Sequence, residues 1–279
     1  MKWNIVADSS IDLFQLEKSY ENINFSTVPF SLSVGDKVFV DDDRLDKEEL
    51  LREMSASRDA STSACPSAGV WLDEFEKEGC TVAITITSGL SGSYNSACAA
   101  MELLLEKEAD KKIYVIDSLT TGAESILILR KLCELIESGL DFDTVIAETE
   151  AFKKTGRTVF ALCCFDNLVK NGRMSKLKGF VANTLGFWGI GIASEVGTIK
   201  MKGVARGQKK AIAGIIDDMR QRSGTVRELI LDHCINEDFA RQVEAAAREQ
   251  WPEINVTVLP TRGLCGYYAE KGGLIIGYR

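Results

Sequence analysis

The sequence predicts an α/β protein of two domains: a parallel-sheet α/β domain over residues 1–160, and a smaller α+β domain with a mixed sheet over residues 161–279. In the first half, short apolar segments are each followed by a hydroxyl-rich loop and a helical pattern, as in doubly wound parallel sheets. In the second half, two apolar segments flank Gly197 as in a hairpin, which indicates a mixed sheet. A length of 279 residues is sufficient for two cores.

In the first half, we expect strands at residues 3–7, 80–86 and 112–117, which lead into the loops DSSID, TSGLSG and DSLTTG. Ligands of open α/β sheets bind beyond the carboxyl ends of the strands, so these loops are expected to converge at one edge of the sheet. A hairpin around Gly35, with the arms STVPFSLSV and DKVFVD, is expected before a helix that starts at about Asp46.

The second half combines strand and helix patterns without a linker of low complexity. A helix is expected from Gln208, and EDFARQVEAAAREQ is expected to form another. The expected strands are TVFALCC, FWGIGIA, GTIKMKGVA, RELILDHC, NVTVLP and GLIIGY. Because no linker separates the halves, we expect the two domains to pack closely together.

Composition and charge exclude several classes of function. The chain has 33 basic and 41 acidic side chains and a net charge of −8, which argues against general nucleic-acid binding. It contains no signal-peptide pattern and no membrane-spanning apolar stretch, so a cytoplasmic protein is expected. The 8 cysteines are scattered without a CxxC pair and there is 1 histidine, which predicts reduced thiols and no metal site.

The stretch ITITSGLSGSYNSA at residues 84–97 places glycines and serines directly after an expected strand. It lacks the lysine of a phosphate-binding P-loop, and it fails the GxSxG pattern of a nucleophilic serine because Ser93 replaces the second glycine. A strand-to-helix loop with serine hydroxyls and free N–H groups can instead hold an anion, with Gly89 and Gly92 allowing close approach of the backbone. The alternative is that Ser91 or Ser93 only caps the helix.

A second hydroxyl cluster, STSACPS at residues 61–67, favours the anion-binding interpretation. Together with DSSIDL, ITSGLSGSYNSA, VIDSLTTGAE, LVKNGRMSK, GVARGQKKA and LDHCINEDFA, in this order, it resembles the DegV family of bacterial fatty-acid-binding proteins. The resemblance covers nearly the whole chain. It implies one long-chain fatty acid in a tunnel between the two domains, presented to a separate ATP-dependent kinase that forms an acyl phosphate for phospholipid synthesis. The carrier itself would be no enzyme and would need no cofactor.

The resemblance also implies the residues that hold the fatty-acid carboxylate. They would be Ser91, with the neighbouring Gly92, and either Thr62 or Ser63, because TSACPS is one residue longer than the commoner form of the motif. Many members carry a histidine where PTRGLCGYY has Arg262. An arginine can bind a carboxylate through two hydrogen bonds, or Arg262 can face solvent or the kinase.

Two further interpretations concern the remaining charged side chains. Basic residues in LVKNGRMSKLKG and ARGQKKA, among them Arg173, Lys176 and Arg206, form either a solvated face or a docking surface for the kinase. His233 is the only imidazole, so a serine acyl hydrolase that uses Ser91 and His233 is the alternative enzyme hypothesis. A carrier of some other apolar anion is a third possibility.

Overall fold

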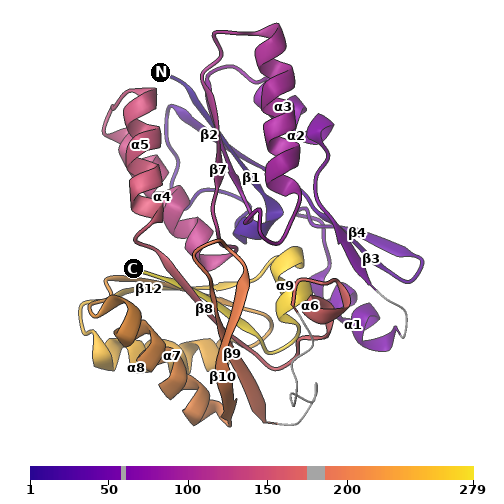
Figure 1. The fold of residues 1–279 in the computed structure, drawn as a ribbon, viewed down its shortest axis with the longest axis vertical. Helices are drawn as coiled ribbons and strands as arrows, with labels where there is room; N and C mark the ends of the chain where they lie inside the picture. The colour runs from indigo at the N-terminus through magenta and orange to yellow at the C-terminus, as the bar shows by residue number, and fades with distance from the viewer. Residues whose placement is uncertain (58–60, 175–185) are drawn as a thin grey trace.

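The computed structural model describes residues 1–57, 61–174 and 186–279. Figure 1 shows an upper part built from most of the first half of the chain and a lower part built mainly from the second half, with the two in contact. The predicted fold class is confirmed: the first part contains a parallel sheet and the second a mixed sheet.

The first sheet has the strand order β2-β1-β6-β7, and all of its neighbouring strands are parallel. Its strands are β1 (Trp3–Asp8), β2 (Ile23–Val28), β6 (Cys80–Thr85) and β7 (Ile113–Asp117). Its two faces are covered by α2 (Ala68–Phe75) with α3 (Ser93–Lys107), and by α4 (Ala123–Glu137) with α5 (Phe142–Lys153). Alternate residues of the strands enter the two cores: Val6 packs with α2 and α3, and Ile5 with α4.

The second sheet has the order β10-β9-β8-β13-β11-β12, in which only the pair β11–β12 is parallel. Its strands are β8 (Arg157–Leu162), β9 (Phe187–Ala193), β10 (Ile199–Arg206), β11 (Glu228–His233), β12 (Asn255–Pro260) and β13 (Leu274–Tyr278). One face packs on α7 (Gln208–Ser223) and α8 (Glu237–Gln250). The other face meets α6 (Asp166–Lys170) and α9 (Gly263–Ala269).

A small antiparallel sheet, β4-β3-β5, joins the two parts. It consists of β3 (Ser31–Val34), β4 (Lys37–Val40) and β5 (Thr62–Ala64), beside α1 (Lys47–Ala56). The predicted hairpin exists, but its first arm is shorter than expected. Pro29 has no N–H, and the residues before it form β2, which pairs with β1 instead.

The predicted boundary after residue 160 falls within β8, all of which belongs to the second sheet. The change from one sheet to the other occurs between the end of α5 at Lys153 and the start of β8 at Arg157. Division of the chain into two domains, 1–160 and 161–279, stays a prediction.

Candidate functional site

A narrow cavity of 90 Å³ lies between the loops of the first sheet and one face of the second. Its walls are mainly apolar, and they come from both parts of the chain: Phe30, Ile86, Leu90, Phe160, Leu162, Leu168, Leu264 and Ile275 are among them. Hydroxyl side chains also reach the cavity, and they include those of Ser63, Ser91 and Tyr268. We call this cavity the apolar pocket; it is apolar along its length with a few polar groups, as is usual for a ligand site.

Ser91 lies in the loop between β6 and α3, which the sequence singled out, and it lines the apolar pocket. The N–H groups of Leu90 and Ser91 both donate to the carbonyl of Thr87, and these hydrogen bonds form a tight turn in the loop. The Oγ of Ser91 accepts a hydrogen bond from the N–H of Ser93 at 3.2 Å. Gly92 occupies the N-cap position of α3 and is not among the described residues that line the pocket.

The hydroxyls of Thr62 and Ser63, the two candidate ligands that the sequence left open, differ in their position relative to the apolar pocket. Successive side chains of a strand point to opposite faces, and in β5 it is Ser63, not Thr62, that is among the described residues lining the pocket. The Oγ of Ser63 and the phenolic oxygen of Tyr268 are 2.7 Å apart and share a hydrogen bond. Thr62 is exposed.

Arg173 also lines the apolar pocket, beside the same loop. Its Nε donates to the carbonyl of Leu90 at 3.1 Å, and its Nη1 donates to the carbonyl of Asn171 at 2.7 Å. Both partners are neutral carbonyl groups, and no ion pair of Arg173 with a carboxylate is found among the described residues. The sequence suggested Arg173 only for partner docking, whereas the structure places it with Ser91 at the pocket.

Asp8 is fully buried beneath the loop and organises it. Its carboxylate accepts hydrogen bonds from the N–H of Ile86 at 2.9 Å and the hydroxyl of Ser93 at 2.7 Å, and also from Ser10. Burial raises the pKa of Asp8, and these donors lower it in part. The expected convergence of DSSID with TSGLSG follows from the parallel pairing of β1 with β6, and Asp8 links the two loops by hydrogen bonds.

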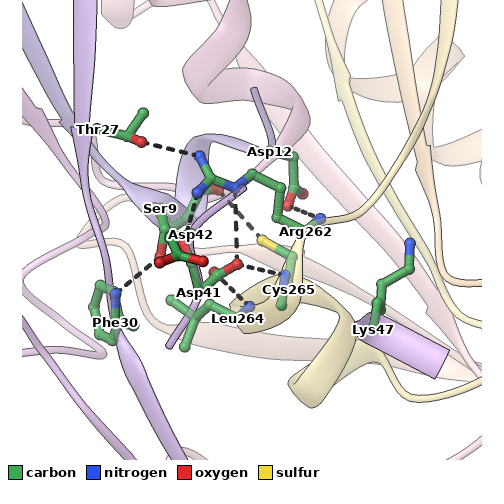
Figure 2. Close-up of polar contacts among 12 residues, drawn as sticks. Ser9, Asp12, Thr27, Phe30, Asp41, Asp42, Lys47, Arg262, Leu264 and Cys265 are labelled. Atoms are coloured by element: carbon green, nitrogen blue, oxygen red, sulfur yellow. Dashed lines mark hydrogen bonds and ion pairs between the residues drawn. The ribbon is translucent and has the colours of Figure 1, made fainter. Parts of the chain in front are cut away.

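Arg262 lies elsewhere, in a polar cluster between α9 and the first part of the chain (Figure 2). Its Nη1 donates to the carbonyl of Leu13 at 2.6 Å, its Nη2 donates to the carbonyl of Asp41 at 2.6 Å, and its Nε is 3.7 Å from the carboxylate of Asp41. Its guanidinium carbon lies 4.0 Å from the centroid of the Phe14 ring.

The side chain of Arg262 is 2% exposed, and Arg262 is not among the described residues that line the apolar pocket. The interpretation of Arg262 as a carboxylate ligand therefore finds no support in its position. Its guanidinium is bonded to backbone carbonyls and lies beside the buried carboxylate of Asp41. Burial raises the pKa of Asp41, and the positive charge of Arg262 acts in the opposite direction.

The hydroxyls at the β7–α4 side of the pocket form a chain that the sequence did not indicate. The Oγ1 atoms of Thr120 and Thr158 are 2.7 Å apart, and Thr158 donates to Oε2 of Glu124 at 2.5 Å. Thr120 and Thr158 line the apolar pocket. Thr120 belongs to the DSLTTG loop that we expected at this edge, whereas Thr158 comes from a strand whose pairing only the tertiary structure decides.

The remaining predicted residues lie apart from this pocket. Arg206 is exposed at the end of β10, with its guanidinium carbon 5.8 Å from the centroid of the Phe187 ring. Lys176 lies outside the described residues. His233 ends β11, and its Nδ1 accepts a hydrogen bond from the N–H of Asn236 at 3.3 Å. Burial lowers the pKa of His233. In the described part of the chain, no hydrogen bond joins it to Ser91.

All 8 cysteines lie in the described ranges, and all are free thiols. Among the described residues, no group of three or more histidine, cysteine or acidic side chains is placed to hold a metal ion. Within the same ranges, no helix has both the length and the apolar character that a membrane crossing requires.

Comparison with known proteins gives a consistent result. A family model described as an uncharacterised protein of the DegV family matches residues 2–278. A DegV domain-containing protein of Streptococcus pneumoniae (strain ATCC BAA-255 / R6) is 41% identical over 278 residues, which is 100% of this chain and 99% of the relative.

Two solved structures are similar along their whole length. The Streptococcus pneumoniae Fatty Acid Kinase (Fak) B3 protein loaded with linoleic acid is 41% identical with a TM-score of 0.96, and the match covers 100% of this chain and 99% of that one. A DegV family protein from Eubacterium eligens loaded with heptadecanoic acid is 33% identical with a TM-score of 0.94, and the match covers 99% and 98%.

Proposed function

Because this chain belongs to the DegV family, we propose that it is a cytoplasmic carrier that binds one long-chain fatty acid in the apolar pocket. The observation that supports this most directly is the pocket itself, in which apolar walls lead to two serine hydroxyls and one arginine. The fatty-acid-loaded structures of the two similar proteins support the same ligand class.

In this proposal the carboxylate lies beside Ser63, Ser91 and Arg173. The hydroxyls donate hydrogen bonds to it, and the guanidinium compensates its charge. The acyl chain lies along the apolar walls, where burial of each methylene contributes about 0.8 kcal/mol. The cavity of 90 Å³ is narrow, so we expect the side chains that line it to move apart when the ligand enters.

The bound acid would be presented to a separate ATP-dependent kinase, which forms the acyl phosphate. The name of the similar Streptococcus pneumoniae protein, Fatty Acid Kinase (Fak) B3, supports a kinase partner. We expect the carrier to perform no chemistry itself. Ser91 has no base beside it in the described structure, since its Oγ accepts a hydrogen bond from a backbone N–H and His233 bonds elsewhere.

Mass spectrometry of the small molecule released by denaturing the purified protein tests the ligand. We expect one fatty acid per chain, and reduced occupancy in the double variant Ser63→Ala/Ser91→Ala. Ser88→Ala is the matched control, because Ser88 lies in the same loop but donates to Asp117 at 2.5 Å. A wild-type protein that carries no fatty acid and takes up none would contradict the proposal.

The kinase step needs a separate measurement. The fatty-acid-loaded protein is incubated with ATP, with and without a fatty acid kinase, and acyl phosphate is measured. Product only when the kinase is present supports the carrier role. Product without the kinase, or ester hydrolysis abolished by His233→Ala, would show an enzyme instead.

A further inference from the structure

A second, larger cavity of 840 Å³ lies beside the apolar pocket and differs from it in charge. Its walls come from the end of α5, the start of β8, the turn between β9 and β10, and the end of α7, which Figure 1 shows around the junction of the two parts. In the part of the chain that the structure describes, five cationic side chains line it: Lys153, Lys154, Arg157, Lys200 and Arg222. We call it the basic cavity.

Two of these cations already have carboxylate partners. Lys153 is 2.6 Å from Glu150, and Arg222 is 3.3 Å from the buried Asp218. Both also donate to backbone carbonyls, so their positions are set by the protein itself. The positive charges of these two side chains are therefore compensated within the protein, without a ligand.

No ion pair joins the other three cations to a carboxylate among the described residues, although the charge of Arg157 acts on the buried Glu124. Lys154 and Lys200 are exposed at the rim. Arg157 is half-buried, and its Nη1 donates to the carbonyls of Lys154 at 2.8 Å and Gly156 at 2.6 Å. Those bonds hold the guanidinium in place and leave its remaining N–H groups available to a ligand.

Among the described residues, the acidic side chains that line the same cavity are Glu124 and Glu195. Glu124 is 6% exposed, accepts a hydrogen bond from Thr158, and its pKa is raised by burial. The cavity therefore concentrates positive charge in a chain whose net charge is −8. A concave site lined by one sign of charge attracts ions of the opposite sign.

We propose that the basic cavity binds a small phosphate-bearing anion, at a site distinct from the fatty-acid carboxylate. Arginine and lysine are the residues that recognise phosphate oxygens, and three cations without an ion pair among the described residues match a multivalent anion better than a single carboxylate. The cavity volume accommodates a small molecule. Thr158 and Ala193 line both cavities, so the proposed anion would lie directly beside the acyl pocket.

Calorimetric titration of the purified protein with inorganic pyrophosphate at low ionic strength tests this site. We expect saturable 1:1 binding that weakens as salt is added. The double variant Lys154→Gln/Lys200→Gln should reduce the affinity at least tenfold, and its circular dichroism spectrum should be unchanged because both side chains are exposed. The matched control is Lys209→Gln/Lys210→Gln, which removes two exposed cations of α7 that are not among the described lining residues.

Absence of saturable binding, or an equal loss in both double variants, would overturn the proposal. A second arm uses phosphatidylglycerol vesicles to separate a lipid head group from a soluble phosphate. We expect that replacing Lys154 and Lys200 does not change the amount of protein that co-sediments with the vesicles. Co-sedimentation that requires these two lysines, in a protein that does not bind pyrophosphate, would also overturn the proposal. Fatty-acid content measured on the same samples reports the carrier function independently, so failure of one proposal is distinguishable from failure of the other.

Discussion

The hydroxyl oxygens of Ser63 and Tyr268 lie 2.7 Å apart at the wall of the apolar pocket, so a hydrogen bond joins β5 to α9 across the two parts of the chain. Tyr268→Phe removes this bond and frees the Ser63 hydroxyl to rotate. We expect fatty-acid affinity to fall about fivefold, consistent with the ~1 kcal/mol that one hydrogen bond contributes. Fluorescent fatty-acid displacement measures this effect.

Tyr267→Phe is the matched control for that variant. The hydroxyl of Tyr267 donates to Ser61 and accepts from Asn171, and Tyr267 is not among the described residues that line the pocket. Loss of the Tyr267 hydroxyl should lower the free energy of unfolding and leave the affinity for fatty acid unchanged. Equal loss of affinity in both variants would show that Tyr268 acts only through stability.

Ser93 and Ser88 provide a second test. Both lie in the segment between β6 and the first turn of α3, and the hydroxyl of each donates a hydrogen bond to a carboxylate. Ser93 is buried and donates to the buried Asp8, whereas Ser88 is exposed and donates to Asp117. We expect Ser93→Ala to lower the free energy of unfolding by about 1–3 kcal/mol and Ser88→Ala by less than about 1 kcal/mol. Urea denaturation measures both, and similar values would argue against Asp8 as the organiser of the loop.

The pair of Arg262 and Asp41 is expected to act on stability more than on binding. Arg262→Met leaves a buried carboxylate without its cation, which costs about 3–5 kcal/mol of unfolding free energy. Asp41→Asn in addition should restore part of this loss. A folded Arg262→Met protein with unchanged stability and strongly reduced fatty-acid affinity would instead make Arg262 a carboxylate ligand.

Two buried carboxyl groups predict a pH dependence of stability. A methyl group on Gly122 would lie 3.0 Å from Oδ2 of Asp232 and 3.1 Å from Oδ2 of Asp12, so both carboxyls converge there. Burial raises the pKa of Asp12 to about 7, and burial with the charge of Asp12 raises the pKa of Asp232 well above its usual value. The folded state therefore retains protons that the unfolded state releases above about pH 4.

Because the folded state binds more protons than the unfolded state in this range, we expect the free energy of unfolding to fall as the pH rises from about 4 to beyond 7. Asp232→Asn should make the decline shallower, because the amide can donate to Asp12 and carries no charge. Chemical denaturation at pH 5 and pH 8 measures the slope. Asp217→Asn, at an exposed position on α7, is the control and should leave the slope unchanged. A steeper decline in Asp232→Asn would contradict the assignment.

Local patterns in the sequence were sufficient to predict most of the helices and strands. Strands at residues 3–8, 80–85 and 113–117 and a helix capped by Asp46 were predictable because their apolar spacing and cap residues act over a few positions. The position of Ser91 at the edge of the sheet was predictable in the same way, because a glycine-serine loop that follows a strand lies at such an edge. The spacing of the motifs also indicated the family, which the comparisons confirm.

The tertiary structure decided what depends on contacts between distant residues. The sequence could not show which of Thr62 and Ser63 lines the apolar pocket, because this depends on which face of β5 meets Tyr268, 205 positions further along the chain. It could not place Arg262 against Asp41, or collect the cations of the basic cavity from four separate segments. The sequence by itself therefore determined the elements and the family, through local spacing. The side-chain partners were decided only by packing, because long-range contacts set the direction in which each side chain points.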